Sequence, residues 1–214
     1  MTAPKRALVI VDVQNDYFDG PMQIQYPPRD ESLANIARAI DAAVAAGLPV
    51  VALQHTLPAD FPVYAEGSEG WKLHPEVARR VGDDWLVATK QFGTVFGGTE
   101  VAQWLADRDV DTITIVGYMT NNCDLATAAE AEVRGLSAEI LSDATGAVHL
   151  ANGAGSVSAE QLHTTLMVLF HSNFAAVAST DEWLTALGDG RALDKGNLVE
   201  SAIAGAQSNE PARA

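Results

Sequence analysis

The sequence contains a single cysteine, few basic residues and few aromatic residues among its 214 positions. The lone Cys123 excludes an intrachain disulfide and a multi-thiolate metal site, so it is either an inert buried thiol or a reactive one. Lysine and arginine number 13 against 28 aspartates and glutamates, which gives a formal net charge of -15. This charge disfavours nucleic acid or an anionic membrane as a partner, because polyanions are repelled. Composition alone does not choose between the two kinds of thiol.

Long apolar runs are also missing. The run from Ala7 to Val11 is interrupted by Asp12 well before it reaches the length of a signal peptide or a membrane span. We therefore expect a cytoplasmic protein. Hydrophobic residues make up 48% of the chain, which is ample for a core. We predict a single domain over residues 1–204 and a flexible C-terminal tail over residues 205–214, whose composition is typical of a frayed terminus.

Short apolar, β-branched runs alternate with segments of helical spacing. Such runs fit strands that are buried on both faces of a parallel sheet. The predicted strands are 7–13, 49–55, 85–88, 112–117, 138–141 and 175–178, and the predicted helices are 33–46, 99–108, 122–134 and 158–171. A terminal helix is expected around 196–204. This alternation predicts an α/β fold, a three-layer α/β/α sandwich around a doubly wound, mostly parallel sheet of about six strands.

Three polar residues follow predicted strands. Asp12 follows the apolar run 7–11 of the first strand, Lys90 closes the run 85–89 of the third, and Cys123 follows the fourth strand after a short turn. Since the carboxyl ends of parallel strands meet at one edge of the sheet, we expect these side chains to converge there. Each residue alone has an ordinary alternative as a turn cap, a solvated strand end or a small core residue. Their joint placement favours a site.

The turn from Gly117 to Cys123 leads from a strand into a helix. A cysteine in the first turn of a helix faces unpaired amides and the positive end of the helix dipole, which favour the thiolate. The same amides can face a developing oxyanion. The alternative is an ordinary strand-to-helix turn in which the cysteine has no chemical role.

Several motifs together resemble the isochorismatase-like superfamily of cysteine hydrolases. The resemblance covers about residues 6–185 and lies in the segments 6–18, 67–76, 90–96, 117–123, 126–129 and 142–147. Separate motifs in the right order, each on the expected element, make this resemblance specific. It implies the isochorismatase-like fold and a hydrolase acting on carbon-nitrogen bonds other than peptide bonds.

The resemblance also implies a catalytic role for each matching residue. Cys123 would be the nucleophile, Asp12 the general base and later acid, and Lys90 the cation that holds the pair and stabilises the thiolate. A non-proline cis peptide would join Tyr118 and Met119, and the amides of Met119 and Cys123 would form the oxyanion hole. Attack on an amide carbonyl would release the amine or ammonia, and water would hydrolyse the resulting thioester.

Polar and aromatic residues near this edge are candidate substrate contacts. Aromatic residues here can wall a pocket, although such residues are about as often simple core. The candidates are Gln14, Tyr17, Phe18, Trp71 and Tyr118.

The nicotinamidase branch of the superfamily binds a metal through an Asp-x-His pair, and this chain departs from that pattern. His55 stands where the aspartate would be and Leu57 where the histidine would be, so we expect no metal and no cofactor. His55 and His74 could still be ligands or substrate contacts, but loop or supporting positions are more common for such residues.

The resemblance leaves three candidate functions. Members that hydrolyse a vinyl ether commonly lack this cysteine, so Cys123 favours a cysteine amidase acting on a small amide, lactam or ureido compound. Residues 120–125 and 171–174 are similar to members of the streptothricin hydrolase-like branch. The alternatives are an isochorismatase-type vinyl-ether hydrolase and a non-catalytic binding protein of the same fold. The resemblance also implies a homo-oligomer, a dimer or a tetramer.

Overall fold

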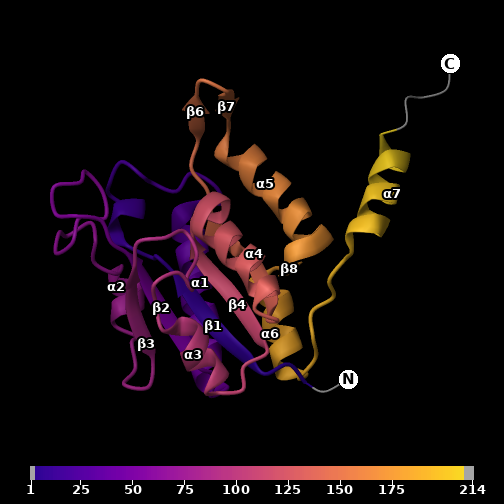
Figure 1. Cartoon of the computed structure of the whole chain (residues 1–214), viewed down its shortest axis with the longest axis horizontal. Coiled ribbons are helices and arrows are strands. Elements are labelled where there is room, and N and C mark those ends of the chain that lie inside the picture. Colours follow the sequence, from indigo (N-terminus) through magenta and orange to yellow (C-terminus); the bar gives the residue numbers. More distant parts are fainter. Residues whose placement is uncertain (1–2, 210–214) are drawn as a thin grey trace.

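Six parallel strands form the central sheet of the computed structural model, which describes residues 3–209 (Figure 1). Their order across the sheet is β3-β2-β1-β4-β5-β8, and all of these neighbours pair in parallel. The strands are β1 (Arg6–Val11), β2 (Val50–His55), β3 (Leu86–Lys90), β4 (Thr112–Tyr118), β5 (Ser137–Gly146) and β8 (Ala176–Ala178). The predicted α/β class and doubly wound sheet are confirmed.

Helices cover both faces of the sheet. They are α1 (Arg29–Ala45), α2 (Pro75–Ala78), α3 (Val101–Ala106), α4 (Leu125–Val133), α5 (Ala159–Leu169), α6 (Thr180–Gly188) and α7 (Leu198–Ser208). Shorter helical turns are η1 (Asn15–Tyr17), η2 (Thr120–Asp124) and η3 (Phe170–Phe174). Buried side chains from α3, α4 and α5 pack in one core cluster, and those from α1, α2 and α6 pack in the other.

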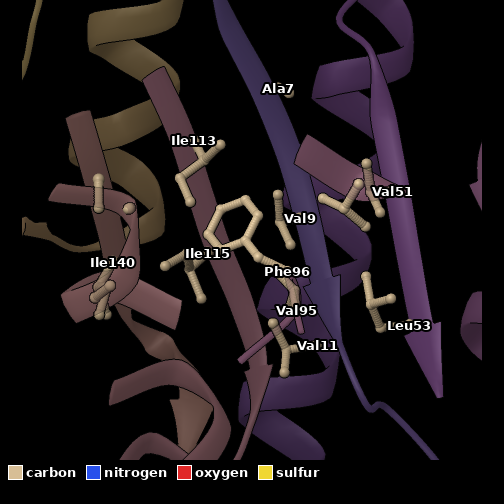
Figure 2. Close-up of a cluster of buried hydrophobic side chains, with 14 of the residues drawn as sticks. Ala7, Val9, Val11, Val51, Leu53, Val95, Phe96, Ile113, Ile115 and Ile140 are labelled. Carbon is tan, nitrogen blue, oxygen red and sulfur yellow. The ribbon is translucent and has the colours of Figure 1, made fainter. Parts of the chain in front are cut away.

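Alternate residues of the strands supply the two core clusters, as the two-residue period of a strand requires. In β1, Val9 faces the cluster with α3, α4 and α5, whereas Leu8 faces the cluster with α1. Figure 2 shows Phe96 beside Ile113 and Ile115 of β4 within the first cluster. These strands read as continuous apolar runs because both faces of the sheet are buried.

The chain order reverses at the centre of the sheet. From β1 the strands β2 and β3 extend to one edge, and from β4 the strands β5 and β8 extend to the other. Ligands of such sheets bind at this switch point, outside the carboxyl ends of the strands. Gly117 brings β4 close to β1 here, because its φ is +118° and a Cβ on it would lie 2.1 Å from the carbonyl oxygen of Val11.

Several helix boundaries differ from the predicted ones. Helix α1 begins at Arg29, earlier than predicted, because Pro28 precedes its first turn. The predicted helix 122–134 is divided into the π-helical turn η2 and helix α4. Helix α6 and the hairpin of β6 (Leu150–Asn152) with β7 (Gly155–Val157) have no counterpart in the prediction.

The C-terminal prediction needs correction. Helix α7 runs from Leu198 to Ser208, so a helix occupies 205–208, where the tail was expected to begin. The apolar residue Ala206 continues the helical pattern past the predicted end. The rest of the predicted tail, residues 210–214, lies outside the described residues. Within residues 3–209 no helix is long and apolar enough to cross a bilayer.

Candidate active site

Asp12, Lys90 and Cys123 meet at the carboxyl edge of the sheet. The Nζ atom of Lys90 lies 2.6 Å from Oδ2 of Asp12 and 3.2 Å from Sγ of Cys123. Asp12 and Cys123 follow β1 and β4, which flank the switch point. Lys90 ends β3, two strands away, and its long side chain spans the end of β2. All three are at least 98% buried, so the ion pair and the thiol interact in a medium that screens charge weakly.

Burial sets the protonation of this cluster. Burial alone would lower the pKa of the Lys90 ammonium, but the charges of Asp12 and Cys123 outweigh it and raise that pKa. Burial and the charge of Asp12 raise the pKa of the Cys123 thiol, and Lys90 offsets only part of this rise. Burial therefore opposes the thiolate form of Cys123, and the ammonium of Lys90 favours it. The expectation that the turn favours a thiolate stays a prediction, because burial and the ammonium of Lys90 act on the thiol pKa in opposite directions.

His55 joins the same cluster at the end of β2. Its Nδ1 atom lies 3.4 Å from Nζ of Lys90, and burial followed by the charge of Lys90 lowers the pKa of His55. A ring nitrogen of His55, a carboxylate oxygen of Asp12 and Sγ of Cys123 lie within 4.8 Å of one another. These atoms are chemically suitable metal ligands, but the ammonium of Lys90 lies among them and opposes a cation.

His74 has a different place. Its Nδ1 atom accepts a hydrogen bond from the amide of Glu76 at the start of α2, and its ring stacks on Phe18 with centroids 4.2 Å apart. His74 thus supports the loop that leads into α2. It makes no contribution to the cluster of Asp12, His55 and Cys123.

Gln14 lies two residues after Asp12. Its side chain connects this segment to the end of β2 and to the long loop between β2 and α2. Its Nε2 atom donates to the carbonyl oxygens of His55 at 3.0 Å and Trp71 at 2.7 Å, and its Oε1 atom accepts from the amide of His55 at 2.8 Å. The side chain is fully buried. Gln14 was predicted to contact substrate, and the structure instead assigns its polar atoms to the backbone of this loop.

The predicted aromatic contacts separate into two groups. The hydroxyl of Tyr118 pairs with Oγ of Ser32 in α1 at 2.8 Å, so Tyr118 packs into the core on the α1 side rather than lining a pocket as predicted. Phe18 packs edge-on against Tyr118 with ring centroids 5.8 Å apart. Both residues serve packing, because their rings meet protein groups on the α1 side of the sheet.

Tyr17 and Trp71 have other surroundings. Burial raises the pKa of the Tyr17 phenol well above its ordinary value, with further contributions from Tyr64, Asp12 and Cys123. Trp71 is partly exposed, and its indole N–H donates to Oγ1 of Thr56 at 2.9 Å. Contact of Tyr17 and Trp71 with substrate stays a prediction.

Two buried residues near the cysteine were not predicted from the sequence to belong to the site. Tyr64, in the loop after β2, packs against Tyr17 with ring centroids 5.4 Å apart and against His55 at the same separation. Asp124 directly follows the cysteine, and neither carboxylate oxygen has a hydrogen-bond partner among residues 3–209. Burial, followed by the charge of Asp12, raises the pKa of Asp124 well above its ordinary value. The only sequence signal was an acidic residue next to the cysteine.

The turn that carries the cysteine has the predicted backbone form. A non-proline cis peptide joins Tyr118 and Met119, as expected from the resemblance. The carbonyl oxygen of Met119 accepts hydrogen bonds from the amides of Asn122 at 3.0 Å and Asp124 at 3.2 Å, which close the turn. The role of the Met119 and Cys123 amides as an oxyanion hole stays a prediction.

A surface cavity of about 350 Å³ lies beside Lys90 at the β3 edge of the sheet. Its walls include Thr56, Glu66, Lys90 and Phe92, and Phe92 is exposed at its rim. A cavity of about 670 Å³ between α3 and α4 contains none of the three clustered residues, so we assign it no part in the chemistry. Access for a small molecule is therefore expected beside Lys90.

The fold and the buried cluster define a class of protein, an α/β protein with a cysteine, a carboxylate and an ammonium at the switch point of its sheet. Residues 6–182 match the family model of the isochorismatase domain, and the chain belongs to the isochorismatase family, a family of hydrolases. The fold matches a crystal structure of a candidate isochorismatase from Burkholderia xenovorans with a TM-score of 0.93. The two chains are 48% identical, and the match covers 98% of this chain and 100% of the other.

Several relatives have named activities, among them the following two. The nicotinamidase/pyrazinamidase of Mycobacterium tuberculosis is 30% identical over 167 residues, which are 67% of this chain and 87% of the relative. The streptothricin hydrolase of Streptomyces noursei is 33% identical over 132 residues, which are 62% of this chain and 50% of the relative. Both names describe those proteins, and both activities concern small molecules.

Proposed function

We propose that the chain is a metal-independent cysteine amidohydrolase that cleaves a carbon-nitrogen bond in a small amide, lactam or ureido compound. The supporting observation is the buried cluster in which Lys90 contacts both Asp12 and Sγ of Cys123. The amide-cleaving activity named for the nicotinamidase relative agrees with this chemistry. A cysteine at this position favours a covalent route over direct attack by water.

The proposed reaction starts from the protonated thiol. As Sγ of Cys123 attacks the substrate carbonyl carbon, the thiol proton passes to Asp12 and a carbon-sulfur bond forms. The developing oxyanion is stabilised by the amides of Met119 and Cys123. When the carbon-nitrogen bond breaks, Asp12 returns the proton to the leaving nitrogen. Water then attacks the thioester, which releases the carboxylic acid and restores the thiol. Lys90 holds Asp12 and the sulfur in place and offsets negative charge.

Metal independence rests on the chemistry of the residues after β2. Leu57 supplies no ligand where the nicotinamidase branch has histidine, and the Lys90 ammonium lies 3.4 Å from Nδ1 of His55. An added cation would have to approach a buried positive charge.

The cytoplasmic location inferred from the sequence stays a prediction.

The test is a panel of amides with direct detection of the thioester. Nicotinamide, pyrazinamide, streptothricin and a ureido acid are incubated with the protein, and ammonia or amine release is measured with and without EDTA. We expect release from at least one compound at a kcat of roughly 1 to 10³ per second, unchanged by EDTA. Acid quenching followed by mass spectrometry should find the acyl group on Cys123.

The outcomes separate the alternatives. Isochorismate hydrolysis that persists in Cys123→Ala would support the vinyl-ether reaction and contradict the thiol mechanism. Loss of amide hydrolysis in EDTA, restored by a divalent metal, would contradict metal independence. Binding of panel compounds without turnover would support the non-catalytic protein.

We also propose that the protein is a homo-oligomer that uses helix α7. This helix has no buried residue, and Leu198, Val199 and Ile203 are 60%, 67% and 55% exposed. In Figure 1 α7 lies at the periphery, at the end of an extended segment after α6. A helix of this length with exposed apolar residues gains stability mainly by packing against another surface.

Replacing Leu198 and Ile203 together by aspartate should therefore reduce the mass in light scattering from a multiple of 22.6 kDa to 22.6 kDa. The control is Gln207→Asp, which adds a charge to the same helix without removing an apolar side chain. A parent protein that is already monomeric at micromolar concentration contradicts the proposal.

A further inference from the structure

The nucleophile turn is tied to helix α5 by a buried histidine. Nδ1 of His163 lies 3.0 Å from Oγ1 of Thr120, the first residue of η2, and Nε2 of His163 lies 3.0 Å from the carbonyl oxygen of Ser142 in β5. His163 is 3% exposed and Thr120 is fully buried. The pair thus joins the turn that carries Cys123 to a neighbouring helix and a neighbouring strand.

The direction of both hydrogen bonds follows from the partners. The carbonyl oxygen of Ser142 only accepts, so Nε2 of His163 carries the proton. Burial lowers the pKa of His163 to about 4, and the Ser142 carbonyl offsets only part of that effect, so the ring is neutral near pH 7. In the neutral ring Nδ1 is then the acceptor, and the hydroxyl of Thr120 donates to it. A neutral ring with both nitrogens partnered fixes a single orientation of the Thr120 side chain.

The ring of His163 is itself held in place. Tyr26 meets it edge-on, with ring centroids 5.5 Å apart and planes inclined by 66°. Ser142 belongs to β5, which pairs with β4 directly before the turn. The contact therefore anchors η2 to the sheet at a second point, independent of its covalent connection to β4.

We infer that Thr120 and His163 are positioning residues, which hold the turn so that Sγ of Cys123 stays within reach of Asp12 and Lys90. This inference rests on the proposed function, in which Asp12 accepts the thiol proton. A displacement of the turn by about 1 Å is enough to cost a large factor in the rate of such a step. Neither residue touches the reacting atoms.

The test measures the reactivity of Cys123 toward iodoacetamide, which requires no substrate. Since Cys123 is the only cysteine of the chain, mass spectrometry reports its alkylation alone. With Asp12 as the base, the rate constant is nearly independent of pH in the neutral range, because no free thiolate has to form. A thiol that has lost its base reacts only as free thiolate, and its rate rises about tenfold per pH unit below the thiol pKa.

The readout is the ratio of the alkylation rates at about pH 8 and about pH 6, which is near one with an active base and about one hundred without one. We expect a ratio near one in the parent protein, in Thr120→Ser and in Ser172→Ala, and a ratio of about one hundred in Thr120→Val and in Asp12→Asn. Thr120→Ser keeps the donor to His163. Ser172→Ala removes another buried hydroxyl, one that bonds only to Leu169 among residues 3–209.

A second variant acts from the other side of the hydrogen bond. His163→Leu leaves Thr120 intact and should give the same high ratio, and the double variant Thr120→Val/His163→Leu should exceed neither single variant because both remove one interaction. Circular dichroism and the melting temperature identify any variant that is unfolded, in which case the remaining single variant decides.

The possible failures are distinguishable. A ratio near one in Thr120→Val or His163→Leu would overturn the positioning role and leave the proposed function standing. A ratio of about one hundred in the parent protein would overturn the Asp12 step, and this inference with it.

Discussion

Replacing Cys123 by alanine should abolish thioester formation and amide hydrolysis, and replacing Asp12 by asparagine should slow hydrolysis by about 10²- to 10⁴-fold. The alanine variant has no atom that can form the acyl-enzyme. The asparagine variant keeps the shape of Asp12 but cannot take the thiol proton, and burial, the largest cause of the raised pKa of Cys123, still opposes a free thiolate in this variant. The measurement is ammonia release from the best substrate of the amide panel.

A control for Asp12→Asn is Asp16→Asn on the same segment. Asp16 is also nearly buried, and its Oδ2 atom accepts from the amide of Tyr64 in the loop after β2. Its replacement should affect the Michaelis constant more than the thioester step, because that loop lies over the site. Hydrolysis that survives in Asp12→Asn at the parent rate would contradict Asp12 as the base.

Replacing Glu139 by leucine should lower the free energy of unfolding by about 3 to 5 kcal/mol, because it leaves a buried guanidinium without its counter-charge. The Glu139 carboxylate accepts from Nε and Nη2 of Arg6, from Oγ1 of Thr114 and from Nε1 of Trp183, at distances from 2.7 to 3.1 Å. The side chains of Arg6 and Glu139 are only 2% and 4% exposed. Urea denaturation should show a lower midpoint with an unchanged slope.

Two further variants test the cause of that loss. Adding Arg6→Met to Glu139→Leu should recover most of the stability, because an apolar pair of similar volume replaces a charged one. Asp181→Asn breaks the exposed pair with Arg38 and should cost less than about 1 kcal/mol. A Glu139→Leu variant as stable as the parent would show that the buried pair contributes no net stability.

The sheet was predictable from the sequence because its central strands β1, β2 and β4 are buried on both faces and include uninterrupted apolar runs. The meeting of Asp12, Lys90 and Cys123 was predictable as well, since parallel topology brings strand ends to one edge. Lys90 is the last residue of β3, as expected for a residue that closes the third strand. Helix α6 was missed although Ser179 and Glu182 form a capping box, a signal that the sequence does carry.

Other features depend on contacts between distant parts of the chain. The contact of His163 with Thr120 could not be predicted, because the two residues are 43 positions apart and nothing local shows that they meet. Gln14 lies beside Asp12 in the sequence, yet its partners lie 41 and 57 positions away. The raised pKa of Cys123 comes from burial by several elements and not from the turn alone. Such properties require the packed fold.

The strands that carry the three central residues are not equivalent. Asp12 and Cys123 follow β1 and β4, which pair directly over their full length at the middle of the sheet, whereas Lys90 belongs to β3 at its edge. The carboxylate of Asp12 and the sulfur of Cys123 are therefore both positioned by the paired strands β1 and β4. The ammonium of Lys90 is positioned by β3. Substitutions on the outer side of β3 can shift the electrostatic field at the sulfur while the distance between acid and nucleophile is preserved. The electrostatics of this site can thus be engineered separately from its covalent geometry.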